Sequence, residues 1–214
     1  ANVKYLLDKV DDLKPGTYIA SVEIADRGRK NDTDYVTPTI AVTQFQVGTA
    51  TEELPVARGC DSCHWDNTTD RGYVLDYPRH NKQFKDLALD QCTGCHDYQP
   101  QSGLGTSFGA HPISRRVHAV HMGSKLNYPN TTVGHSDVDP DRNWDINFPQ
   151  DIRNCETCHG AKTSGSWKTE ASRLPCSGCH DSDAVQVHMK LMTFDPTPDN
   201  PWSGDEQESC KTCH

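Results

Sequence analysis

The chain has 214 residues and a formal net charge of −9, and only 34% of its residues are hydrophobic. Typical globular domains are roughly 45 to 50% apolar, so side chains alone would give this chain a thin core. The acidic balance argues against a nucleic-acid partner, and no apolar run reaches the ~18 residues that a transmembrane helix needs.

Residues 1–57 contain no cysteine or histidine, and their pattern predicts a small antiparallel β segment. Pro15-Gly16 is a turn signal, and the run 17–25 then alternates, with one face made of Tyr18, Ala20, Val22 and Ile24. The run 39–47 places Ala41, Thr43, Phe45 and Val47 on a shared face, and a further short element is expected at 3–7. A lone hairpin is marginally stable in water, so we expect this one to pack against other structure.

From residue 58 the sequence changes, because the pattern Cys-Xaa-Xaa-Cys-His occurs five times and uses all ten cysteines. The units are Cys60/Cys63/His64, Cys92/Cys95/His96, Cys155/Cys158/His159, Cys176/Cys179/His180 and Cys210/Cys213/His214. This is the attachment signature of c-type haem: the two thiols form thioethers to one porphyrin, and the histidine binds the iron on its proximal side. The sequence therefore predicts five haem c groups with these five histidines as proximal ligands.

Zinc and disulfides are the rival explanations of the paired cysteines. The third and fourth units are spaced like a four-cysteine zinc site, and ten cysteines would also suit a disulfide framework. Neither explanation needs a histidine after every second cysteine, and an odd number of units does not pair off. Haem attachment accounts for both features.

Five porphyrins would also supply the missing apolar mass. The predicted fold class is therefore a multihaem cytochrome c, in which a mostly irregular and α-helical domain at 58–214 wraps haem with few short helices. Its best helix is expected at 112–126, between a Gly/Ser-rich loop at 99–110 and a polar loop at 127–149. Arg115-Arg116 on this helix are expected to form a solvated face. Without haem, we expect this domain to be largely unfolded.

Six histidines remain outside the motifs, which nearly matches five distal positions and favours bis-histidine ligation. These are His80, His111, His118, His121, His135 and His188. On a helix, His118 and His121 lie three residues apart and can reach two different haems. His135 is the expected spare. Methionine ligation is the alternative, but Met122 and Met189 directly follow histidines, so we expect them to pack against porphyrin.

The arrangement resembles one pentahaem domain of the outer-membrane decahaem cytochromes of metal-reducing bacteria, the OmcA/MtrC type. The matching features are a β segment before the first motif, Arg79-His80 before Cys92, the stretches 116–123 and 148–159, and His188 after the fourth motif. The resemblance implies a split β-barrel segment followed by a haem domain. It also implies distal roles for His80, His118, His121 and His188, with His111 preferred over His135 as the fifth ligand.

The same resemblance implies partners and a location. Expected partners are other multihaem cytochromes or copies of this chain, with flavins or ferric and mineral acceptors. Haem attachment to this motif takes place outside the cytoplasm, so we expect an outer-membrane, cell-surface or extracellular protein, with the periplasm as the alternative. The chain departs from the family in having one pentahaem unit, a hairpin in place of a barrel and no lipid-bearing cysteine. We therefore expect 1–57 and the haem at Cys210 and Cys213 to meet further structure, from a longer parent chain or a neighbouring copy.

Electron transfer through a relay of closely spaced haems is the function that these features favour. The main alternative is a multihaem reductase of a small nitrogen or sulfur oxyanion, which needs one iron with an open position. Haem storage is a third function that the motifs allow. All five motifs end in histidine, and no residue is assigned a catalytic role. Whether the chain is also an enzyme, for instance a terminal metal reductase, stays open.

Overall fold

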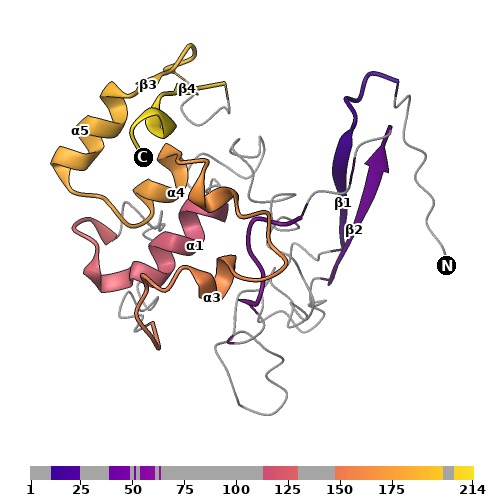
Figure 1. Ribbon diagram of the computed structural model, residues 1–214, viewed down its shortest axis with the longest axis horizontal. Coiled ribbons are helices and arrows are strands. Elements are labelled where there is room, and N and C mark those ends of the chain that lie inside the picture. Colours follow the sequence, from indigo (N-terminus) through magenta and orange to yellow (C-terminus); the bar gives the residue numbers. More distant parts are fainter. Residues whose placement is uncertain are drawn as a thin grey trace, which may run out of the picture.

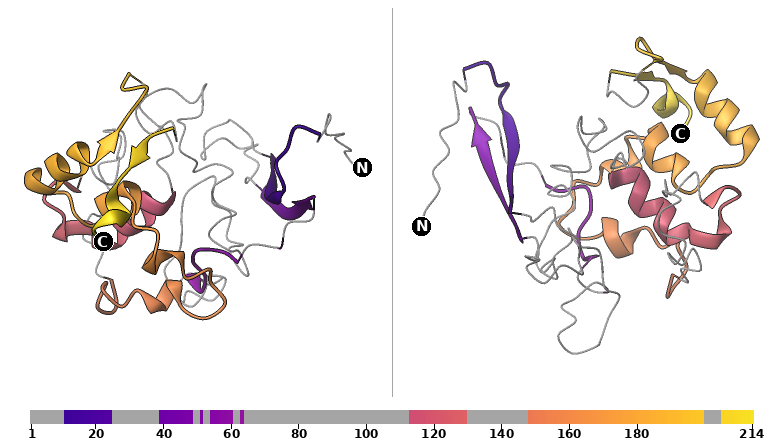
Figure 2. Two further views of the ribbon diagram at one scale, coloured as in Figure 1. Left: turned by 45° about the horizontal axis from the view of Figure 1, so that its top comes forward. Right: turned by 180° about the vertical axis from the view of Figure 1, so that it is seen from behind.

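The computed structural model describes residues 11–24, 39–48, 51, 54–60, 63, 113–129, 148–199 and 205–214. Figure 1 shows a β-hairpin to one side of a lobe of short helices, and both views of Figure 2 agree with this separation. The expectation of few short helices and small antiparallel sheets is confirmed for the described part of the chain. The expected element at 3–7, the loop at 99–110 and residues 130–147 lie outside it.

The hairpin pairs β1 (Gly16–Ile24) with β2 (Thr39–Val47), as the alternating pattern predicts. Tyr18 lies opposite Phe45 in the register, and their rings stack with centroids 5.8 Å apart. On the other face, the side chains of Thr17 and Gln46 exchange hydrogen bonds of 3.1 and 2.7 Å. The two predicted apolar faces therefore coincide in the folded hairpin, and cross-strand pairs stabilise the register.

The lobe begins with α1 (Ile113–Met122), close to the helix predicted at 112–126. Gly123 has a φ of +50°, which ends the α-helical geometry of α1. The 3₁₀ turn η4 (Gly123–Lys125) follows directly. The remaining helices are short, and several coincide with the cysteine motifs. They are α3 (Glu156–His159), η5 (Ser166–Lys168), α4 (Arg173–Ser177), α5 (Asp183–Leu191) and η6 (Cys210–Thr212).

Helix α1 packs directly on the fourth motif through Gly178. An added Cβ at Gly178 would lie 2.6 Å from the Arg115 carbonyl oxygen and 2.7 Å from the Cβ of His118. The glycine therefore permits a contact between backbones that no other residue type allows. Arg115 is partly buried in this contact, so the expectation of a solvated helix face at 115–116 was wrong for this residue.

Asp181 ties the end of α1–η4 to the fourth motif. Its carboxylate is buried and accepts hydrogen bonds from the backbone N–H groups of Asn127 and Tyr128, at 2.8 and 2.7 Å, and from the Asn127 side-chain amide, at 3.1 Å. The Asp181 carbonyl accepts a further bond of 2.7 Å from the Gln186 side chain. Asp181, the residue that follows His180, thus links α1–η4 to α5.

The core of the described part is as thin as the composition predicts. Its buried hydrophobic residues are Ala57, Ala119, Leu126, Leu174 and Met189. Large apolar side chains on α5 and on β3 (Thr193–Phe194) remain in solvent, with Leu191 73% and Phe194 64% exposed. Side chains alone therefore leave apolar surface uncovered in the helical lobe.

Candidate functional site

The cysteine motifs share one local conformation. In the four motifs seen in whole or in part, the carbonyl of the first cysteine accepts a bond of 3.1 to 3.2 Å from the N–H of the second. In three of them the same carbonyl also accepts the N–H of His159, His180 or His214, at 2.9, 2.9 and 3.2 Å. Each of these three motifs is therefore one helical turn that carries two thiols and an imidazole together.

The sequence assigns every cysteine a thioether bond to haem, and none of the described cysteines forms a disulfide. They are Cys60, Cys63, Cys155, Cys158, Cys176, Cys179, Cys210 and Cys213. Cys63 and Cys213, the second cysteines of the first and fifth motifs, differ in exposure, because Cys63 is half-buried and Cys213 is exposed. Cys63 also lies near the third motif, where its charge would raise the pKa of Cys158. Attachment of haem at Cys63 and Cys213, as at the other cysteines, stays a prediction.

Burial keeps several of the described thiols protonated. Desolvation raises the pKa of Cys158, Cys176 and Cys210, and raises that of Cys179 to about 11. Among the described residues, no group of three or more cysteine, histidine or acidic side chains is arranged to hold a metal ion.

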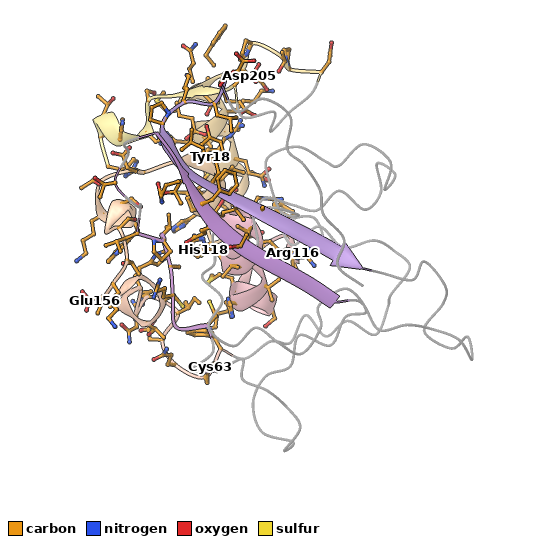
Figure 3. All side chains as sticks on the ribbon, turned by 90° about the vertical axis from the view of Figure 1, so that its right-hand side faces the viewer. Tyr18, Cys63, Arg116, His118, Glu156 and Asp205 are labelled. Atoms are coloured by element: carbon orange, nitrogen blue, oxygen red, sulfur yellow. The ribbon has the colours of Figure 1, made fainter. Side chains whose placement is uncertain are left out.

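Two histidine pairs bring a motif histidine to face another histidine. The rings of His118 on α1 and His159 in the third motif lie 6.1 Å apart between centroids, with an interplanar angle of 29°. The rings of His188 on α5 and His214 in the fifth motif lie 6.2 Å apart at 77°. Figure 3 labels His118, which α1 carries within the helical lobe.

These separations can be compared with those of two axial ligands on one metal ion. A metal–imidazole bond is about 2 Å long and the ring centre lies roughly 1 Å beyond the nitrogen, so two such rings on opposite sides of a metal have centroids about 6 Å apart. Both observed pairs match this distance. Aromatic rings in direct contact also have centroids about 4.5 to 7 Å apart. Each separation therefore fits two axial ligands of one metal as well as a direct ring contact.

Hydrogen bonds at Nδ1 orient two of the candidate ligands. His159 Nδ1 donates to the Val56 carbonyl at 2.8 Å, and His121 Nδ1 donates to the Val117 carbonyl at 2.7 Å. Each bond holds the proton on Nδ1 and leaves Nε2 as the metal-binding atom, the usual arrangement around metal-ligating histidine. The His121 ring also lies edge-on against Phe148, with centroids 5.1 Å apart.

His118 is the most enclosed of the described histidines. Burial lowers its pKa, and the neighbouring His159 lowers it further, so the imidazole is neutral at pH 7. The Nδ1 atom of His118 is buried and has no hydrogen bond of good geometry. The nearby Ser114 carbonyl raises the pKa of His118, but this effect is smaller than that of burial. A neutral imidazole with an available nitrogen is the form that binds iron.

Segment 54–58 supports the third motif from far away in the sequence. Besides the Val56 bond, the Arg58 N–H donates to the Cys158 carbonyl at 2.8 Å, and Ser164 N–H donates to the Pro55 carbonyl at 2.9 Å. On the other side, Trp167 Nε1 donates to the His159 carbonyl at 3.1 Å. The third motif is therefore held by contacts that its own local sequence does not predict.

Several predicted site residues lie outside the described part of the chain. They are His64, Cys92, Cys95, His96 and the distal candidates His80 and His111, together with the spare His135. Three groups that contact the motifs or the segments beside them were not predicted from the sequence. They are the Val56 carbonyl, Asp181 and the cluster of Arg173 with Glu206 and Glu208. No local signal marks any of these three, because each acts through a partner remote in sequence.

In the third, fourth and fifth motifs, one turn carries two thiols and a histidine, which is the arrangement that attachment of c-type haem needs. Residues 56–214 match the family described as outer membrane cytochrome MtrC/MtrF-like, domains II/IV, and the chain belongs to this family. The resemblance stated above is thus confirmed at the level of the family. Cytochromes of this family carry c-type haem and transfer electrons at the outer membrane.

No curated protein and no solved structure matches the chain. Of the helices in the described ranges, none has the length and apolarity to cross a bilayer.

Proposed function

We propose that the chain carries five haem c groups and conducts electrons between them outside the cytoplasm. Each haem would be attached through one cysteine motif and ligated by two histidines. When bound, haem supplies a one-electron iron centre, and the protein sets the ligation, spacing and dielectric around it. The electrons would pass to other multihaem cytochromes, to copies of this chain, or to flavins and ferric or mineral acceptors.

The observation that carries this proposal is the pair of gaps between histidine rings, 6.1 Å between the centroids of His118 and His159 and 6.2 Å between those of His188 and His214. Both gaps join a motif histidine to a histidine that the sequence selects as a distal ligand. We assign His118 to the haem of Cys155 and Cys158, and His188 to the haem of Cys210 and Cys213. Three haem irons remain, with His64, His96 and His180 as their proximal ligands. His121, His80 and His111 are then their distal ligands.

The haem count and the ligation are tested on the holoprotein. Intact mass should equal that of the chain with five haems, because five motifs use all ten cysteines. Reduced protein should bind carbon monoxide poorly, since no iron has an open position. A different mass would overturn the count. Rapid, stoichiometric binding at one iron would overturn full bis-histidine ligation and favour the oxyanion reductase.

Substitution of the α1 histidines tests whether they serve different haems. His118→Met and His121→Met should each raise the reduction potential of one haem, because thioether ligation favours ferrous iron more than imidazole does. The two substitutions should affect different haems, which potentiometry with visible and paramagnetic resonance spectra distinguishes. Lys190→Met, at an exposed position of α5, gives a control that adds a thioether without removing a histidine. Shifts of the same haem in both histidine variants would contradict the assignment.

A further inference from the structure

A cluster of charged side chains joins the segment before the fourth motif to the segment before the fifth. Arg173 opens α4, three residues before Cys176, while Glu206 and Glu208 precede Cys210. The Arg173 guanidinium lies 3.2 Å from Glu206 Oε1 and 3.8 Å from Glu208 Oε1, and its backbone N–H donates to Glu208 Oε2 at 2.7 Å. One arginine therefore binds both glutamates of the segment before Cys210.

This cluster is enclosed, unlike the pairs Arg153–Asp151, Lys168–Glu156 and Lys211–Glu170. The side chains of Arg173, Glu206 and Glu208 are 14%, 4% and 20% exposed. By comparison, the side chains of Arg153 and Asp151, which also form a close ion pair, are 86% and 53% exposed. Screening by water is weak in the enclosed cluster, so loss of the cation would leave two poorly solvated carboxylates facing each other.

The segment that the cluster holds carries the fifth motif. Glu208 lies in β4 (Gln207–Glu208), which pairs with β3 and ends two residues before Cys210. Next to the strand, the Ser209 N–H donates to the Met192 carbonyl at the end of α5 at 3.1 Å. The fifth motif is thus tied to α4 on one side and to α5, which bears His188, on the other.

We propose that Arg173 is a positioning residue that fixes the fifth motif relative to the fourth, so that His214 stays opposite His188 and the last two haems keep one separation. The proposal rests on the proposed function, because it takes His188 and His214 as the ligands of one iron. Electron exchange between haems falls steeply with distance, so a fixed separation maintains the rate of the relay.

The test compares fully haem-loaded variants. Arg173→Gln removes the cation, Arg173→Lys retains it, and Arg153→Gln removes the cation of the exposed pair as a matched control. In Arg173→Gln, about one haem of the five should become high-spin, bind carbon monoxide after reduction and shift in potential. Arg173→Lys should restore most of the bis-histidine spectrum, and Arg153→Gln should behave as the unmodified protein.

A reference variant identifies which haem responds. His188→Ala should give the same single-haem signal as Arg173→Gln, because both expose the same iron. If His188→Ala leaves all spectra unchanged, the ligand assignment of the proposed function is wrong, whatever Arg173 does. If His188→Ala gives the signal and Arg173→Gln resembles Arg153→Gln, or perturbs several haems together, the positioning role is refuted. Should Arg173→Gln fail to mature, Glu208→Gln decides the same question: perturbation of that haem supports the role, and an unchanged spectrum refutes it.

Discussion

Protein produced without haem attachment is expected to lack most of the structure found beyond residue 56. In the described part, only five hydrophobic residues are buried, and large side chains such as Leu191 and Val187 are exposed. Conformational entropy opposes folding by about 1 to 2 kcal/mol per residue for the backbone alone, which so small a core does not offset. Burial against porphyrin would add roughly 25 cal/mol for each Å² of apolar surface covered.

Far-UV circular dichroism and amide hydrogen exchange of α1 and α5 measure this effect. Haem-free chain should show little helix and no protection, as metal-dependent small domains do without their metal. A matched variant, Cys155→Ala with Cys158→Ala, removes one attachment site and should lose protection mainly in α1 and segment 54–58, which surround the third motif. Slow exchange of both helices in fully haem-free protein would contradict the expectation.

How far the sequence predicts this fold depends on the range of the interactions. The strands at 16–24 and 39–47 and the helix at 113–122 follow from local alternation and helix signals, and all three were predicted within a few residues. The same alternation predicts the face on which Tyr18 and Phe45 lie, whereas the register that pairs them comes from the structure. These elements depend on neighbouring residues, and a single sequence contains that information.

The arrangement of the site depends on longer-range contacts. Counting leaves six candidate distal ligands, and the family resemblance selects His118 and His188 among them. Neither says that they lie beside His159 and His214, because those pairings arise from packing between separate helices. The Val56 carbonyl that orients His159 lies 103 positions away. Asp181 and Arg173 look like ordinary surface charges in the sequence, and only their burial against remote partners makes them structural.

Gly178→Ala is expected to destabilise the protein and to disturb the haem of the third motif. Gly178 has a φ of −72° and a ψ of −23°, a conformation that alanine adopts freely. On backbone entropy alone, the substitution would therefore stabilise by about 0.4 to 1 kcal/mol. Steric overlap opposes this gain, because the new Cβ would lie 2.6 Å from the Arg115 carbonyl oxygen and 3.1 Å from the Ala119 amide nitrogen. These are backbone atoms, which no side-chain rotation moves away.

The overlap should dominate, with a net loss of about 1 to 3 kcal/mol in the free energy of unfolding, as for other overpacked contacts. Relief requires α1 to move away from the fourth motif, and His118, whose Cβ lies 2.7 Å from the new atom, moves with it. The third-motif haem should then bind carbon monoxide after reduction. Ser177→Ala, one residue earlier, removes only the Ser177 Oγ–H bond to the Leu174 carbonyl at 2.9 Å and serves as the control. Denaturation midpoints measure the loss of stability, and carbon monoxide titration measures the opening of the third-motif haem. A Gly178→Ala protein that is as stable as the control and does not bind carbon monoxide would contradict the prediction. It would show that the position of His118 does not depend on this contact.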